Sequence, residues 1–147
     1  MAERASDSNQ STVLVIEDDQ DMNELVCAIL DTAGYDVQSA DNGKDGFEKA
    51  LEFKPDLILL DIMLPEVDGI EVCRSLSSHE DTRHIPVIML TLKRELSVKL
   101  SSYIAGAKRY ITKPFGVEDL LNEVRNTLRQ PGIPPETGQG PPLMDMD

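Results

Sequence analysis

Apolar and polar positions follow two patterns that alternate along residues 12–130. Short runs of aliphatic and β-branched residues predict buried strands, at residues 12–17, 35–39, 56–61, 85–90 and 109–112. Each run is followed by a longer segment whose apolar residues recur at helical spacing. Five strand–helix units in succession predict a single doubly wound α/β domain built on a five-stranded parallel sheet.

The helical segments carry apolar stripes that predict which of their faces are buried. The first stripe consists of Met22, Leu25, Val26, Ile29, Leu30 and Ala33. Asp21 and Glu24, spaced as in a capping box, are expected to begin this helix, and Gly34 is expected to end it. The later stripes are Phe47, Ala50 and Leu51; Ile70, Cys73 and Leu76; Leu96, Leu100 and Ile104, before Gly106; and Val117, Leu120, Leu121, Val124 and Leu128.

Both ends of the chain differ in composition from the predicted domain. Residues 1–11 are small and polar, and residues 131–147 hold eight Pro or Gly. Segments of this kind bury too little apolar surface to fold by themselves. We therefore expect a flexible N-terminal tail, a domain at residues 12–130, and a flexible C-terminal tail or linker.

The overall charge limits the class of partner. The chain carries a formal net charge of -13, whereas nucleic-acid phosphates require clustered Lys and Arg, so this domain is not expected to bind nucleic acid directly. No apolar run is long enough to cross a membrane and no charged start precedes one, so we expect a cytoplasmic location without membrane contact. Cys27 and Cys73 lie in apolar helical patterns, which predicts reduced, buried thiols.

Polar residues stand where the predicted strands end. The first strand ends in Glu17 and Asp18, the third in Asp61, the fourth in Thr91 and the fifth at Lys113. In open parallel sheets, ligands bind in the crevice beyond these carboxyl ends. Each pair of carboxylates would repel there by about 1–4 kcal/mol, a penalty that a bound cation removes. The pattern therefore predicts a cation site at this edge of the sheet.

The residue types at this edge indicate phosphoryl chemistry. Carboxylate oxygens select Mg²⁺ or a similar hard cation, which also accepts phosphate oxygens as ligands. Asp61 is the expected nucleophile, which would form an acyl phosphate. We expect Asp18 to bind the metal directly and Glu17 to bind it through a water. The backbone carbonyl of Met63 would complete the metal site. Thr91 and Lys113 would contact the phosphoryl oxygens.

Four short motifs carry these residues: IEDD at 16–19, LLDIMLPEVDG at 59–69, MLT at 89–91 and YITKPF at 110–115. Together and in this order they resemble the receiver domain of two-component response regulators, over about residues 12–130. The resemblance implies a flavodoxin-like fold with strand order 2-1-3-4-5 and a cis peptide bond before Pro114. It implies the same site roles as those given above.

The resemblance also implies a signalling function. Asp61 would accept a phosphoryl group from a phosphohistidine donor, either a sensor histidine kinase or a histidine phosphotransfer protein. The domain would be a phosphoacceptor and not an enzyme with a separate substrate. Thr91 and Tyr110 hold the positions of switch residues and would shift the surface formed by the last two helices and the strand at 109–112. That surface would control a downstream protein partner or a fused output domain.

Several positions depart from the usual pattern of the family. Leu92 is bulky where a small residue is usual, which could narrow access to the phosphoacceptor. Two basic pairs, Lys93 with Arg94 and Lys108 with Arg109, flank the expected output surface. They could dock an acidic partner, although solvated surface charge is the commoner role of such residues.

Other interpretations fit the sequence less well. A receiver-like module could bind partners without phosphorylation, with Asp61 only capping a strand. A flavin-binding module should offer hydroxyls and glycines to a phosphate, whereas the acids at 17–19 would repel one. An aspartyl phosphatase normally has a second acid where Met63 stands. His79 and His84 lie in a polar segment without companion ligands and are expected at the surface.

Overall fold

The computed structural model describes residues 11–92 and 95–129 and contains a parallel five-stranded sheet of order β3-β2-β4-β5-β6. When the strands are counted from the first one along the chain, which is β2, this order is 2-1-3-4-5, as the resemblance implied. The strands are β2 (Thr12–Ile16), β3 (Asp36–Ala40), β4 (Leu57–Leu60), β5 (Val87–Thr91) and β6 (Arg109–Thr112). The helices are α1 (Gln20–Thr32), α2 (Gly43–Phe53), α3 (Gly69–Ser78), α4 (Leu96–Ile104) and α5 (Val117–Arg129). The predicted fold class is confirmed, and the predicted strand ends are wrong by no more than 2 residues.

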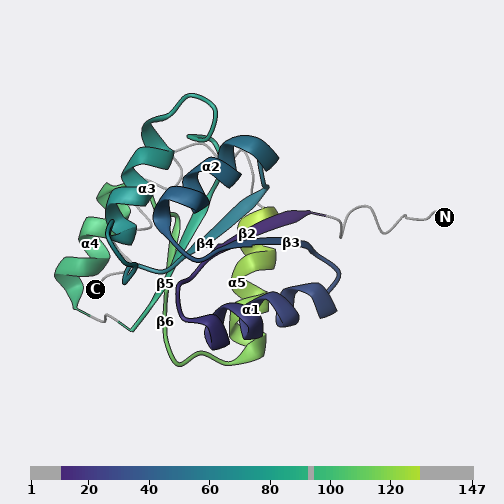
Figure 1. Cartoon of the computed structure of the whole chain (residues 1–147). Helices are drawn as coiled ribbons and strands as arrows, with labels where there is room; N and C mark the ends of the chain where they lie inside the picture. The colour runs from purple at the N-terminus through teal and green to yellow at the C-terminus, as the bar shows by residue number, and fades with distance from the viewer. Residues whose placement is uncertain (1–10, 93–94, 130–147) are drawn as a thin grey trace.

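Helices cover both faces of this sheet (Figure 1). Helices α1 and α5 pack on one face, and α2, α3 and α4 pack on the other. Successive strand residues point to opposite faces, so β2 sends Val13 and Val15 toward α1 and α5, and Leu14 and Ile16 toward the other layer. All four residues of β4 are buried. Because both faces are covered, the strand sequences are continuously apolar instead of alternating.

Helix α1 begins earlier than the predicted capping box requires. Its N-cap is Asp19, whose Oδ1 accepts a hydrogen bond from the Met22 N–H at 3.1 Å. The prediction of a capping box at Asp21 and Glu24 is therefore wrong, because the N-cap lies two residues earlier, at Asp19. Gly34 follows the helix with φ of 100°, as its predicted role as terminator requires.

The predicted apolar stripe of α4 faces solvent. Leu96, Leu100 and Ile104 are 56%, 36% and 81% exposed, and the one buried residue of this helix is Ser102. The spacing predicted a helix correctly, but it identified the wrong inner side. The small residues Ser102 and Ala105 occupy that side instead.

Two other stripes extend too far around their helices. Leu25 of α1 and Val117 of α5 are each 50% exposed, and Ala33 is also exposed. The remaining residues of both stripes are buried or half-buried. The apolar face predicted from helical spacing is therefore wider than the face of the helix that contacts the sheet.

Three further sequence expectations concern the cysteines, membrane-spanning segments and the ends of the chain. Cys27 and Cys73 form no disulfide; Cys73 is buried and Cys27 is half-buried. Within residues 11–92 and 95–129, no helix is long and apolar enough to cross a bilayer. The predicted tails, apart from Ser11, lie outside the described residues, as do Lys93 and Arg94.

Two buried threonines predict opposite effects of the same substitution. Among the described residues, Thr127 Oγ1 is buried without a hydrogen-bond partner, whereas Thr82 Oγ1 donates to the Leu76 carbonyl at 2.6 Å. Thr127→Val removes an unpaired hydroxyl and should raise the free energy of unfolding by about 1 kcal/mol. Thr82→Val leaves a buried carbonyl without its hydrogen-bond donor and should lower the free energy of unfolding by about 1–2 kcal/mol. Urea denaturation measures both, and changes of the same sign would contradict this account.

Candidate functional site

The hydrogen-bond ladders of the sheet continue one residue beyond the strands and carry the predicted site residues with them. The amide of Asp61 donates to the last carbonyl of β2 at 3.0 Å, and the amide of Glu17 donates to the last carbonyl of β3 at 3.0 Å. The amide of Lys113 donates to the Thr91 carbonyl at 2.8 Å. The backbone of the site is therefore as firmly placed as the sheet itself.

The loop that follows β4 folds tightly against the strand end. The Met63 N–H donates to Asp61 Oδ1 at 3.0 Å, and the Gly69 N–H donates to the Ile62 carbonyl at 2.7 Å. A Cβ atom on residue 69 would overlap the Asp61 backbone, so this position requires glycine. Asp68 caps the first turn of α3 with its side chain. The sequence at 59–69 therefore holds this loop in place beside the Asp61 carboxylate.

Lys113 joins two carboxylates that come from different strands. Its Nζ lies 2.7 Å from Glu17 Oε1 and 3.1 Å from Asp61 Oδ2, and no more than 10% of any of the three side chains is exposed. Burial, together with the Asp61 carboxylate, raises the pKa of Glu17 to about 7, although Lys113 opposes the shift. Burial by itself would lower the pKa of Lys113, but Glu17 and Asp61 outweigh it and raise that pKa. Lys113 is therefore an ammonium at neutral pH.

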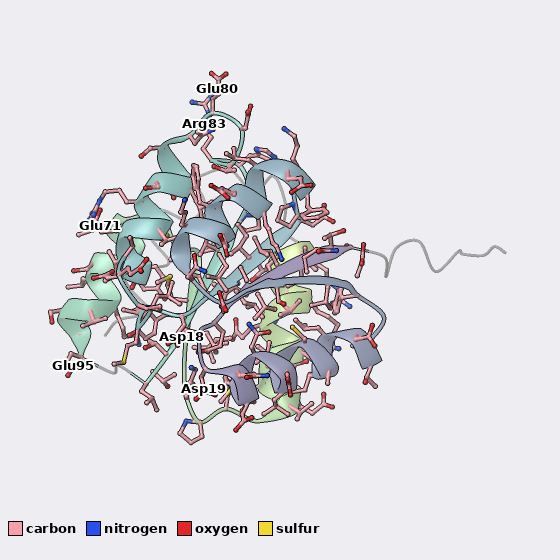
Figure 2. The ribbon with its side chains drawn as sticks, viewed as in Figure 1. Asp18, Asp19, Glu71, Glu80, Arg83 and Glu95 are labelled. Carbon is pink, nitrogen blue, oxygen red and sulfur yellow. The ribbon has the colours of Figure 1, made fainter. Side chains whose placement is uncertain are left out.

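Asp18 adds a third carboxylate to this pair. One oxygen each from Glu17, Asp18 and Asp61 lies within 4.8 Å of the others. Asp18 is exposed, and Figure 2 shows it next to Asp19 on the turn that enters α1. Three hard oxygen donors, one of them open to solvent, suit a divalent cation such as Mg²⁺, which keeps several of its waters. The cluster can therefore bind such an ion.

Thr91 and Tyr110 lie on the two neighbouring strands β5 and β6. Thr91 is fully buried at the end of β5, in register with Thr112. Tyr110 packs against the core beneath α2, α3 and α4, and Lys99 Nζ lies 5.7 Å from its ring centroid. Burial raises the pKa of Tyr110 to about 12, so its hydroxyl is protonated at neutral pH. The switch roles of Thr91 and Tyr110 stay predictions.

Sequence reasoning missed one polar residue at this edge. Asn23 of α1 donates from Nδ2 to the carbonyl of Glu17 at 2.9 Å and to that of Ala40 at 3.2 Å. The only sequence signal is an amide in the first turns of a helix that starts at Gln20. No local motif predicts these bonds, because the Ala40 carbonyl is 17 residues away in the sequence.

Two further expectations concern the histidines and the Lys113–Pro114 peptide bond. His84 is exposed, as predicted, whereas His79 is half-buried with its ring 5.7 Å from that of Phe47. Neither belongs to a cluster of metal-ligating side chains among the described residues. The Lys113–Pro114 peptide bond is cis, so that prediction is confirmed.

Fold and site together define a class of signalling protein. Residues 13–125 match the response regulator receiver domain, and the chain belongs to this family. Over 118 residues it is 47% identical to the DNA-binding dual master transcriptional regulator RpaA of Synechocystis sp., an alignment that covers 80% of this chain and 49% of that protein. The chain thus spans about half the length of the curated relatives it matches.

Solved structures agree with this placement. The BeF3-activated N-terminal receiver domain of Klebsiella pneumoniae RstA is 34% identical, with a TM-score of 0.75 over 81% of this chain and 99% of that one. The receiver domain of the Pseudomonas aeruginosa sensor histidine kinase PA1611 is 27% identical, with a TM-score of 0.76 over 81% of this chain and 98% of that one. In the latter protein a magnesium ion is coordinated in the active-site cleft.

The raised pKa of Glu17 predicts a pH dependence of stability in the presence of a chelator. The folded protein holds the Glu17 proton up to about pH 7, whereas the unfolded chain releases it near pH 4.5. The stability that this proton contributes is therefore fully present below about pH 4.5 and lost as the pH rises through about 7. Relative to Glu17→Gln, the wild-type free energy of unfolding should fall by at least about 1 kcal/mol across that range. Urea titrations measure this difference in the free energy of unfolding between wild type and Glu17→Gln. A difference that rises with pH would contradict the raised pKa of Glu17.

Proposed function

We propose that this domain is a phosphorylation-dependent signalling switch that accepts a phosphoryl group on Asp61 in a Mg²⁺-dependent reaction. One observation supports the proposal above all others. The Lys113 ammonium lies 3.1 Å from Asp61 Oδ2, while Glu17 and Asp18 supply further carboxylate oxygens within 4.8 Å. A carboxylate with a purely structural role would need the ammonium, but it would gain nothing from two additional acids.

The proposed phosphodonor is a phosphohistidine on a sensor histidine kinase or a histidine phosphotransfer protein. An Asp61 oxygen attacks the phosphorus while the bond to the imidazole nitrogen breaks, and the electron pair of that bond leaves with the imidazole. Because the transition state is loose, positioning and charge neutralisation supply most of the rate enhancement. A Mg²⁺ ion held by Asp18, Asp61 and the Met63 carbonyl, with Glu17 acting through a water, would neutralise charge on the phosphoryl oxygens.

Lys113 and Thr91 are the proposed ligands of the phosphoryl oxygens. An ammonium has three N–H donors, and two of those of Lys113 are directed at Glu17 and Asp61. When Asp61 becomes an acyl phosphate, Lys113 can keep its bond to Glu17 and donate to a phosphoryl oxygen. Thr91 would contribute its hydroxyl from the adjacent strand end.

The proposed signal leaves the site through the surface formed by α4, β6 and α5. Movement of Thr91 toward the phosphoryl oxygens would free space into which the Tyr110 ring turns. Phosphorylation would thereby favour one of two arrangements of this surface. A downstream protein partner or a fused output domain would recognise the favoured arrangement.

The proposed output is protein binding in the cytoplasm, without direct contact of this domain with nucleic acid or membrane. The net charge of -13 supports the absence of nucleic-acid binding, because an acidic domain repels phosphates. The proposed basic docking patch is weakened by an ion pair, because Arg109 Nε lies 3.6 Å from Glu123 Oε1. Lys108 is exposed and is the better candidate contact.

Phosphorylation at Asp61 can be tested directly. Incubation with a small phosphodonor and Mg²⁺ should yield an acid-stable, base-labile adduct, detected by mass spectrometry as one added phosphoryl group. Asp61→Asn and chelation of Mg²⁺ should each abolish it. Asp68→Asn is a matched control that keeps the helix cap and should leave the adduct intact. Persistence of the adduct in Asp61→Asn, or without Mg²⁺, would exclude the proposed chemistry, and its absence throughout would favour a module that binds partners unphosphorylated.

The metal role of Asp18 predicts a difference between two neighbouring acids. Asp18→Asn should weaken Mg²⁺ binding by about tenfold or more, and it should stabilise the metal-free protein slightly because it removes like-charge repulsion. Asp19→Asn also removes one charge, but Asn caps a helix as well as Asp does, so its effect on affinity should be small. Calorimetric titration with Mg²⁺ compares the two, and equal affinities would argue against direct binding by Asp18.

A further inference from the structure

The side chain of Asn23 bridges the ends of two strands. Its Nδ2 donates to the Glu17 carbonyl at 2.9 Å and to the Ala40 carbonyl at 3.2 Å. The Ala40 carbonyl also accepts from the Glu17 N–H at 3.0 Å, so both of its lone pairs are used. One amide group therefore ties α1 to the end of β3 and to the residue that immediately precedes Asp18.

Two backbone carbonyls and the Cys27 thiol together define the orientation of this amide group. The Cys27 Sγ donates to Asn23 Oδ1 at 3.3 Å, whereas the two backbone carbonyls accept from Asn23 Nδ2. A thiol donor on one side and carbonyl acceptors on the other are compatible with only one placement of the amide oxygen and nitrogen. The bridge from Asn23 to the strand ends is therefore directional.

The turn that carries Asp18 is held on both sides. On its N-terminal side, Asn23 binds the Glu17 carbonyl. On its C-terminal side, the Asp19 N–H donates to Glu17 Oε2 at 3.1 Å, and Asp19 caps α1 through Met22. Asp18 is the exposed residue between these two anchors, so its backbone has little freedom to turn its carboxylate away from Asp61.

We propose that Asn23 is a positioning residue for the cation site, because it fixes the backbone that aims the Asp18 carboxylate. The inference rests on the proposed Mg²⁺-dependent function. Asn23 itself does not bind the metal. Its contribution is to hold the Glu17–Asp18 peptide in place before the ion arrives, so that binding does not require that turn to be ordered.

A simpler explanation is that Asn23 only attaches α1 to the sheet. One substitution distinguishes this structural role from the proposed positioning role. Asn23→Asp has nearly the same shape, but it directs a carboxylate oxygen at two carbonyl oxygens and so breaks the bridge. It also adds a negative charge to the cleft that Glu17 and Asp18 line. The added charge alone would tighten Mg²⁺ binding. Weaker binding would therefore reflect lost positioning.

The test is a Mg²⁺ titration of the whole chain by calorimetry, with amide NMR spectra of the metal-free protein. Asn23→Asp and Asn23→Ala should each bind Mg²⁺ about tenfold more weakly than wild type, as expected for loss of a partner that orients a ligand. The metal-free spectra should show shifts at the Glu17 and Asp18 amides while the remaining spectrum stays that of the folded protein.

Gln20→Glu is the matched control. Gln20 lines the same cleft, and its Nε2 donates to Glu24 within α1 at 3.2 Å, so the substitution adds the same charge without touching the strand ends. Its Mg²⁺ affinity should be equal to or higher than that of wild type.

The possible results separate the two proposals. If Asn23→Asp binds Mg²⁺ as tightly as wild type, the positioning role is overturned and the proposed function stands. Weaker binding that accompanies loss of the folded spectrum would also overturn it, because a purely structural role would then suffice. If the wild-type chain binds no Mg²⁺, the proposed function fails and the inference fails with it.

Discussion

The pairing of one buried ammonium with two buried carboxylates is the interaction on which the carboxyl edge of the sheet depends. Lys113 is 96 residues from Glu17 and 52 from Asp61 in the sequence, yet its Nζ bonds both. Transfer of such charges out of water costs several kcal/mol each, which only well-formed geometry offsets. The backbone bonds that extend the strand ladders into the site provide that geometry. The hydrogen bonds that build the sheet therefore also determine which charges meet at its edge.

Much of the fold and the candidate site could be predicted, because both follow from local sequence constraints. A strand covered on both faces must be apolar at every position, so runs such as the one at 57–60 are distinct from helical segments. Parallel strands all end at one edge, so polar residues that follow them must gather there. The sequence alone therefore predicts that Glu17, Asp18, Asp61 and Lys113 meet at that edge. The strand order and the cis bond before Pro114 required the family resemblance.

What could not be predicted depends on contacts between distant parts of the chain. Periodicity does not specify which side of a helix meets the sheet, and in α4 the small residue Ser102 faces inward while Ile104 faces solvent. The start of α1 is set by the Asp19 cap, whereas the local sequence motif pointed to Asp21. The role of Asn23 arises only because β3 lies beside β2, so that the Ala40 carbonyl comes within its reach.

Helix α4 is attached to the domain more weakly than the other helices. It buries one residue, its N-cap residue Glu95 makes no side-chain capping bond, and its largest apolar side chains face solvent. Detaching its turns exposes little new apolar surface, so the free energy of local opening is small compared with that of global unfolding. The helix that forms part of the proposed output surface is therefore also the helix that the domain holds least firmly.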